Sequence, residues 1–436
     1  MLEEAEEIGR RVRRARLRLG MPQADLATAL GKSQGWVSKM ERGLIELDRV
    51  GLLNQVAAEL HVHPNDLIGR PYSSSPDDNQ WQVAAELHVH PNDLIGRPYS
   101  SSPDDNQWQV AASSILRELR RYDLTPAFDG TPRPAPQLWR EVTRLHRLRD
   151  TAANVAILRV LPDLFREARA LAEVAEGHER EEAYAIYAVC CKFAHTAAHS
   201  LGHPELVAMA CERAAWSARL SGDPVLPAVA DWMRVWDMWA TADWADALTL
   251  SDKAIGSVQQ AYEDGDPLAV RAWGTLQLRA AVSAARASRA SEAEDRIGYA
   301  KDAAERMDAY VGAPVYDRHS LTFSAGNVQI HAISVALEMG KQGKALEINR
   351  RTSPELVGAL PNSRQGHHHM DIARAWLWDG NRGQALVELE TAERIAPQLV
   401  RNHPIARSTL RSIVYAERAA TREKLRHMSD RFHLDG

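Results

Sequence analysis

The chain has 436 residues, of which 45% are hydrophobic and 25% are charged, and its formal net charge is −5. This length accommodates two or three domains with a large core, and the composition is that of a soluble globular protein. No apolar run reaches 18 residues, and the first residues, MLEEAEEIG, lack the basic-then-apolar layout of a secretory signal. We therefore expect a cytoplasmic protein with no membrane partner.

The three cysteines, Cys190, Cys191 and Cys211, form no even framework and show no zinc-ligand spacing. We expect them to be reduced thiols packed in helices, which agrees with a cytoplasmic location.

The overall negative charge hides a basic stretch near the N-terminus. Between Ile8 and Arg42 there are nine Lys or Arg residues and two acidic residues, so the local net charge is 9 − 2 = +7. Such a patch attracts phosphate through counterion release, whatever the charge of the distant residues. The alternative at this point is a solvated, arginine-rich helix face without a nucleic-acid partner.

Five short helices are predicted between residues 8 and 70. Apolar residues recur at helical spacing, and glycines or capping residues separate the segments. Gly20, Gly31 and Gly43 suit helix C-termini, whereas Ser33 and Asp48 suit N-caps. The side chains expected to point inward are Ile8, Val12, Ala15, Leu19, Leu26, Ala27, Leu30, Val37, Met40, Val50, Leu53, Val56, Ala57 and Leu60.

A specific resemblance rests on Gln23, on DLATALG at 25–31, on SQGWVSKMERG at 33–43 and on VAAELHVHPNDLI at 56–68. These residues resemble the Xre/Cro/C1-type helix-turn-helix domain of bacterial and phage repressors, a five-helix, lambda-repressor-like fold. The resemblance covers about residues 6–70. Pro22 stands where the family usually has Ser or Thr, so a side-chain cap worth roughly 0.5–2 kcal/mol is missing.

The resemblance implies a recognition helix at residues 33–42 that enters the major groove of double-stranded DNA. Gln34 would make a bidentate contact to adenine, and Trp36 would stack on a sugar or a thymine methyl. Glu41 is expected to be structural and to pair with Arg10 or Arg14. The implied base contacts are Ser33, Gln34, Trp36 and Lys39, and the implied phosphate contacts are Gln23, Ser38 and Arg42. A homodimer on a palindromic operator is the implied assembly, with a nucleoid-associated location.

Residues 55–81 recur unchanged as residues 82–108. The first copy continues the helix that begins at Asp48, whereas the second follows SSPDDNQW and has Pro76 upstream, so we expect only the first copy to dock. A recent duplication or assembly error and a deliberate spacer both explain the second copy. Residues 71–105 are predicted to form a tether with a loosely held helix near 80–90.

From about residue 104 the chain is predicted to be almost entirely helical, with a Pro-rich break at 124–136. The segment DIARAWLWDGNRGQALVELETAERIAP at 371–397 resembles a tetratricopeptide repeat. We expect lengthened, irregular repeats of this kind to stack into an α-solenoid whose groove is lined by the first helix of each pair. The positions treated as equivalent are Val207, Ala247, Ala293, Ala345 and Ala385.

The expected domains are residues 1–70 (helix-turn-helix), 71–112 (duplicated linker), 113–150 (connecting helices) and 151–425 (tetratricopeptide-like sensor and dimerisation domain). This all-α layout is similar to actinobacterial Xre-family regulators and to the RRNPP peptide-sensing receptors of quorum sensing. The resemblance implies a peptide or small-molecule signal in the groove.

Candidate ligand residues follow from the repeat register. Trp232, Trp236 and Trp239 fall on groove-facing positions, although three tryptophans on one helix face are also explained as core. Asn327 and Arg374 have donors suited to a peptide backbone or a carboxylate. The remaining groove positions are Lys192, His199, Arg286 and His367.

The run HHH at 367–369 predicts no metal site, because adjacent helical residues point about 100° apart and no Cys or carboxylate cluster stands nearby. No nucleophile motif or Gly-rich phosphate loop stands out. We expect no cofactor and no enzymatic activity. Two hypotheses remain, a DNA-binding transcriptional regulator, such as a repressor, and a protein-interaction scaffold with a vestigial helix-turn-helix; the basic stretch favours the first.

Overall fold

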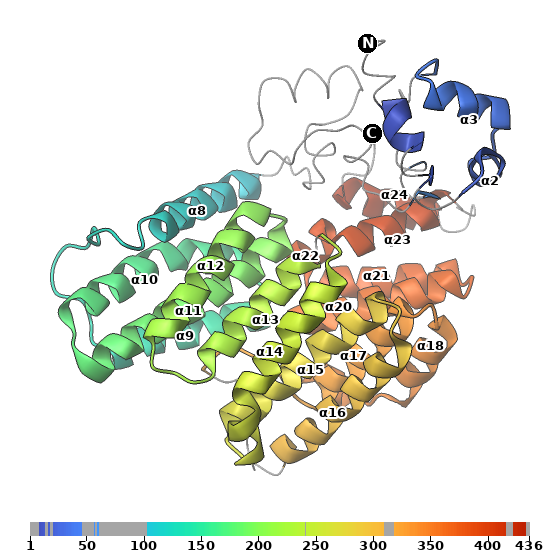
Figure 1. Ribbon diagram of the computed structural model, residues 1–436. Coiled ribbons are helices and arrows are strands. Elements are labelled where there is room, and N and C mark those ends of the chain that lie inside the picture. Colours follow the sequence, from blue (N-terminus) through green and yellow to red (C-terminus); the bar gives the residue numbers. More distant parts are fainter. Residues whose placement is uncertain are drawn as a thin grey trace. The chain divides into compact units, whose positions relative to one another are not determined.

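The computed structural model describes residues 8–13, 16–17, 21–45, 56, 59–60, 103–239, 241–308, 318–415 and 422–432. The regular secondary structure that these residues form is α-helical (Figure 1), which confirms the predicted fold class. No helix among them is both long enough and apolar enough to cross a lipid bilayer. The chain divides into two compact units, residues 1–99 and 100–436, and each is described by itself.

In the first unit, α2 (Gln23–Ala29) and α3 (Gln34–Glu41) follow a helical segment at residues 8–13. Val56 and Leu60, from the first copy of the duplicated segment, pack in the core of this unit, so the first copy docks as predicted. The second copy and the helix expected near 80–90 lie outside the described residues. The buried core is made by Val12, Leu26, Ala27, Leu30, Val37, Met40, Val56 and Leu60.

The ends of these two helices follow from local chemistry. The Ser33 hydroxyl accepts a hydrogen bond from the Trp36 backbone N–H at 3.1 Å and so caps α3. Gly31 and Gly43 end α2 and α3 with positive φ angles of 62° and 71°. Pro22 precedes α2 without a side-chain cap, as the sequence predicts.

The second unit consists of successive helices, which Figure 1 shows stacked side by side. The first of them, α8, begins at Pro103, inside the segment expected as duplicated linker, and buries Ala111 and Ala112 of the third QVAA. The helices are α8 (Pro103–Arg120), α9 (Ala135–Asp150), α10 (Asn154–Val174), α11 (Gly177–Leu201), α12 (Pro204–Leu220), α13 (Leu226–Met238), α14 (Trp244–Glu263), α15 (Pro267–Arg286), α16 (Ala290–Asp308), α17 (Ala325–Glu338), α18 (Gln342–Arg351), α19 (Pro354–Gly358), α20 (Asn362–Trp378), α21 (Arg382–Ile395), α22 (Pro397–Asn402), α23 (Pro404–Tyr415) and α24 (Arg422–Phe432).

The helices pack in consecutive pairs: α11 with α12, α13 with α14, α15 with α16, α17 with α18, and α20 with α21. The predicted register is confirmed, because each position treated as equivalent is the fourth residue of the second helix in its pair. A small or apolar side chain at this position lets the two helices approach closely. The five residues, Val207, Ala247, Ala293, Ala345 and Ala385, are all buried.

Each joint between paired helices turns through a residue with positive φ, five residues before the equivalent position. At one of them, the Gly340 N–H donates to the Leu337 carbonyl and the Lys341 N–H to the Ala336 carbonyl, which is the Schellman pattern. A sixth such joint at Ala152 (φ 55°) connects α9 to α10. The five predicted joints turn at Gly202, Ala242, Ser288, Gly340 and Gly380.

Helix α15 lies at the centre of this unit. Every residue from Ala269 to Ala285 is buried, so neighbouring elements surround the helix on all sides. The first helices of the pairs on either side, α13 and α17, both pack against it. Polar side chains of α15 must therefore find partners inside the unit rather than in open solvent.

Candidate ligand face and candidate nucleic-acid interface

Four of the nine predicted ligand positions belong to one surface on the first helices of the pairs. We name this surface the first-helix face and define it as His199, Trp236, Trp239, Arg279, His331, Arg364 and His367. The guanidinium carbon of Arg279 lies 4.1 Å from the ring centroid of Trp232, 4.6 Å from that of Trp236 and 4.7 Å from that of Trp239. Trp232 is only 4% exposed and belongs to the core, whereas Trp236 and Trp239 are half-buried.

Histidine rings from three helices border the same place. The His199 ring centroid lies 4.0 Å from that of Trp236, and the rings of His367 and His403 meet edge to face at 5.1 Å. Burial lowers the pKa of His199 and of His331 to about 3, and Arg364 contributes to the lowering at His331. These rings are therefore neutral at pH 7.

Two of the predicted ligand residues are paired with a carboxylate of the protein itself. Arg374 donates to Glu338 at 3.0 Å, and Arg286 approaches the same carboxylate at 3.3 Å. Together they hold the pKa of Glu338 below its ordinary value, against the effect of burial. Arg374 and Arg286 are thus engaged in a structural network between α15, α17 and α20.

The other two predicted polar residues bind the chain's own backbone. Asn327 is 1% exposed, and its amide donates to the Thr322 carbonyl at 3.0 Å. Lys192 is buried on α11 and donates to the Ser320 carbonyl. Both therefore hold residues 318–323, which precede α17, rather than facing solvent.

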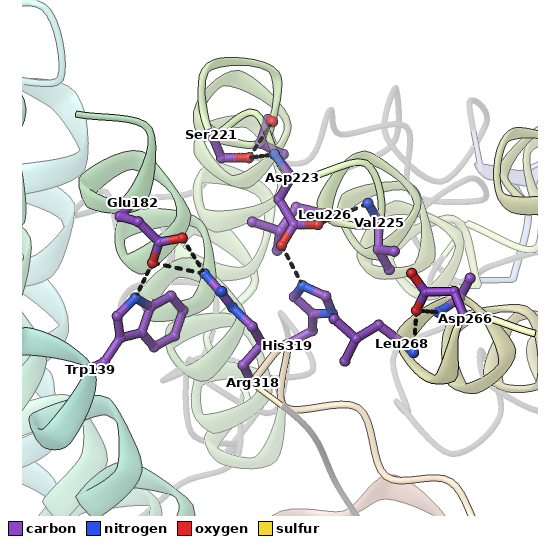
Figure 2. Close-up of polar contacts among 12 residues, drawn as sticks. Trp139, Glu182, Ser221, Asp223, Val225, Leu226, Asp266, Leu268, Arg318 and His319 are labelled. Carbon is purple, nitrogen blue, oxygen red and sulfur yellow. Dashed lines mark hydrogen bonds and ion pairs between the residues drawn. The ribbon is translucent and has the colours of Figure 1, made fainter. Parts of the chain in front are cut away.

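Figure 2 shows how residues 318–323 are fixed at their start. The His319 Nε2 lies 2.7 Å from Asp223 Oδ2, and Asp223 also accepts from the Val225 N–H at the beginning of α13. Arg318 donates to both oxygens of Glu182 at 3.1 Å. These contacts are not predictable from sequence patterns, because residues 318–323 carry no helical periodicity.

In the first unit, α3 has one buried face and one exposed polar face. Val37 and Met40 point into the core, whereas Trp36 and Ser38 are half-buried. The residues of the predicted DNA contact set that are exposed on or next to α3 are Ser33, Gln34, Lys39 and Arg42. Lys39 and Arg42 give this face a positive charge at the end where phosphates would lie.

The first unit is similar to a known domain family. Residues 7–67 match a family model described as a helix-turn-helix domain. Residues 7–67 of the first unit are thus a helix-turn-helix domain. No curated protein matches the chain. Among solved structures, the chain is similar to that of Bacillus thuringiensis PlcR in complex with the peptide PapR7 and DNA, at 14% identity and a TM-score of 0.25, over 71% of this chain and 100% of that one. A TM-score this low carries no conclusion about the present chain.

Within the helix-turn-helix domain, Glu41 is structural, as predicted, and its partners include Arg16 and Gln23. The expected partner Arg14 lies outside the described residues. Arg16 Nε lies 2.6 Å from Glu41 Oε1, and Gln23 Nε2 donates to Glu41 Oε2 at 2.7 Å. One amide hydrogen of Gln23, expected at a phosphate, is therefore committed to Glu41. Removing the Arg16–Glu41 pair from the basic stretch leaves its net charge at 8 − 1 = +7.

Lys32 is a further residue at this interface. Its ammonium lies 5.8 Å from the ring centroid of Trp36, directly before the cap of α3, and the side chain is exposed. Sequence reasoning counted Lys32 in the basic stretch without giving it a contact. Lys32 directly precedes Ser33, the capping residue of the predicted recognition helix, and this position could have indicated a DNA contact.

Proposed function

We propose that the protein is a sequence-specific, DNA-binding transcriptional regulator. The observation that carries this proposal is the exposed face of α3, with Ser33, Gln34, Lys39 and Arg42, in a stretch of local charge +7. An α-helix fits the major groove of B-DNA, and cations beside it neutralise phosphates. The opposite face of α3 packs in the core, so only this polar face is free to read DNA.

Each exposed residue has a role in this proposal. Gln34, in the first turn of α3, pairs with adenine, and Lys39 and Arg42 bind the groove edge and the phosphates. Gln23 retains a second amide hydrogen for a phosphate oxygen while the first is bound to Glu41. A homodimer would place two such helices on a palindromic operator, one helical turn of DNA apart.

We further propose that the helical repeats sense a peptide or small-molecule signal on the first-helix face. The support for this is that half-buried Trp236 and Trp239 lie against Arg279, and that burial, together with Arg364 and His199, lowers the pKa of His367. Apolar walls with a few directed polar groups are the usual composition of a ligand site. Trp232 is buried in the core and packs against Arg279 there. Asn327 and Arg374 stabilise the structure around the site.

The test is an electrophoretic mobility shift of the full chain on the DNA upstream of its own gene, at a series of salt concentrations. Binding should weaken steeply as salt rises, because each phosphate contact releases counterions. Lys39→Glu combined with Arg42→Glu should abolish binding, whereas Arg219→Glu, at an exposed position on α12, should leave it unchanged. Absence of binding even at low salt would favour the protein-interaction scaffold instead.

A further inference from the structure

We infer that the first-helix face binds an anionic ligand, whose carboxylate or phosphate group is held by Arg279 of α15 and Arg364 of α20. The inference rests on the proposed ligand control and names the chemical class of the ligand. Neither arginine was singled out by the sequence. The contacts of Arg279, and the contrast of both residues with the neighbouring arginines, carry the inference.

Arg279 is a buried cation without a counter-ion in the part of the chain that the structure describes. The residue is 7% exposed, and its described contacts are the rings of Trp232, Trp236 and Trp239. Cation–π contacts offset part of the cost of removing the charge from water. A carboxylate or phosphate would supply the remaining compensation, because buried charges are stable only when they are paired.

Arg364 brings a second cation to the same place. It lies in the first turn of α20, is half-buried, and no described residue forms a side-chain hydrogen bond or ion pair with it. Burial and the charge of Arg149 lower the pKa of Arg364 to about 10. Burial lowers the pKa of Arg279 as well, and Arg364 adds to that effect. The positive charge of Arg364 thus disfavours the charged form of Arg279, and a bound anion would offset that repulsion.

The neighbouring arginines show that this fold supplies partners where the role is structural. Arg286 and Arg374 share the carboxylate of Glu338, and Arg149 donates to the carbonyl and hydroxyl of Ser320. Arg279 and Arg364 differ from them, since the described residues offer neither a carboxylate nor a carbonyl oxygen to their side chains. Because they lack such partners, Arg279 and Arg364 are the two arginines that we assign to the ligand.

The surroundings also define the body of the ligand. Trp236 and His199 present rings that are tilted by 35° to each other, at a centroid distance of 4.0 Å, beside the Arg279 guanidinium. Burial lowers the pKa of His199, His331 and His403 to values of about 3 to 4, so these rings add no charge at pH 7. The site therefore suits an anionic group attached to a flat or apolar body. A small aromatic acid and the C-terminal carboxylate of a short peptide share that chemistry.

The test uses the full chain, with thermal unfolding and tryptophan fluorescence as readouts. Phenylacetate and inorganic phosphate are the small-anion probes, and phenylacetamide is the neutral control. A mixture of random heptapeptides with free C-termini is compared with the same mixture as C-terminal amides. At least one anionic probe should raise the melting temperature saturably, and its neutral counterpart should not; which probe does so identifies the source.

Arg279→Met and Arg364→Met should each weaken binding of that probe at least tenfold, whereas Arg219→Met on the exposed face of α12 should not change it. Without ligand, Arg279→Met should melt at the same or a higher temperature, because it removes an uncompensated buried charge. A fall of several degrees would show that Arg279 is structural and overturn the inference, as would equal binding of neutral and anionic probes or no binding of any anion. DNA plays no part in these readouts, so they fail or succeed independently of the proposed DNA binding.

Discussion

The guanidinium of Arg16 and the carboxylate of Glu41 form a buried two-point ion pair, with Nε–Oε1 at 2.6 Å and Nη2–Oε2 at 3.1 Å. Both residues are 6% exposed. Arg16 is a helical residue that precedes α2, and Glu41 is the last residue of α3, so the pair fixes the helix that we propose to enter the major groove. Arg16 also donates to the Met21 carbonyl at 2.6 Å, which extends the link to the start of α2.

Glu41→Ala should therefore destabilise the helix-turn-helix domain by about 3–5 kcal/mol, because it leaves a buried guanidinium without its partner. Hydrogen exchange of the amides in residues 21–45 of the full chain measures this, and exchange should accelerate strongly. Asp25→Ala, at an exposed position on α2, serves as the control and should change little. Unchanged protection in Glu41→Ala would show that the pair does not stabilise the domain.

Gly9 should not tolerate a side chain. A Cβ atom at Gly9 would lie 2.4 Å from the Met40 carbonyl oxygen, so Gly9→Ala must push the first helix away from α3. We expect lowered protection of α3 amides and weaker DNA binding. Gly35→Ala is the matched control, because its Cβ would meet no atom closer than the Ser33 hydroxyl at 4.0 Å. Equal effects of the two substitutions would contradict the close helix contact.

Substitutions at two of the repeat joints should change the melting temperature in opposite directions. Ser288 adopts a φ of 61° at the joint between α15 and α16, where an L-residue is strained by roughly 1–2 kcal/mol. Ser288→Gly should raise the melting temperature of the full chain, and Gly340→Ala, at the equivalent joint with φ 70°, should lower it. If both changes shift the melting temperature in the same direction, the joints are not equivalent.

The buried histidines predict destabilisation by mild acid. The pKa values of His199 and His331 are about 3 and those of His368 and His403 about 4, all below the ordinary 6.5. The unfolded chain therefore binds more protons than the folded chain, and stability falls as the pH decreases from about 6.5 toward 4. Burial raises the pKa of Asp371 to about 6, so this carboxyl group alone would increase stability as the pH falls.

Thermal unfolding of the full chain between pH 7.5 and 4.5 measures this loss. His199→Gln should flatten the pH dependence in that window, whereas His178→Gln, at an exposed position, should leave it as in the wild type. A melting temperature that stays constant from pH 6.5 to 4.5 would show that these histidines are protonated in the folded state.

Sequence patterns predicted the elements that are determined by local signals, such as the spacing of apolar residues and the residues at helix ends. Leu26 and Leu30 recur at helical spacing in the second predicted helix, as do Val37 and Met40 in the third. Ser33 and Gly43 mark the ends of the third helix, so the sequence was sufficient to predict the helix-turn-helix domain. In the repeats, a buried small residue five positions after a glycine located joints such as Gly340 and Gly380. The joint at Ala152 escaped notice because it has neither a glycine at the turn nor a small residue five positions later, where Ile157 stands.

The first-helix face was harder to predict from the sequence, because its central residue, Arg279, is buried, whereas arginines are usually exposed. Arg279 stands in the sequence QLRAAVSAAR, where an arginine is ordinarily read as part of a solvated face. Its burial depends on tryptophans of α13, more than forty residues earlier, and on the position of α20. Asn327 was predicted to bind a ligand's peptide backbone or carboxylate, whereas in the structure its amide donates to the chain's own Thr322 carbonyl.

The measurement that tests the central claim most directly is selection of binding sites from a random duplex library by the full chain, followed by affinity measurements on the recovered site. We expect one enriched motif with two symmetric half-sites. Gln34→Ala should cost about 1–3 kcal/mol and relax the preference at one base pair, whereas Arg42→Ala should weaken all sequences about equally and flatten the salt dependence. Recovery of no motif, or a change of base preference in Arg42→Ala but not in Gln34→Ala, would contradict the assignment of α3 as the element that reads DNA.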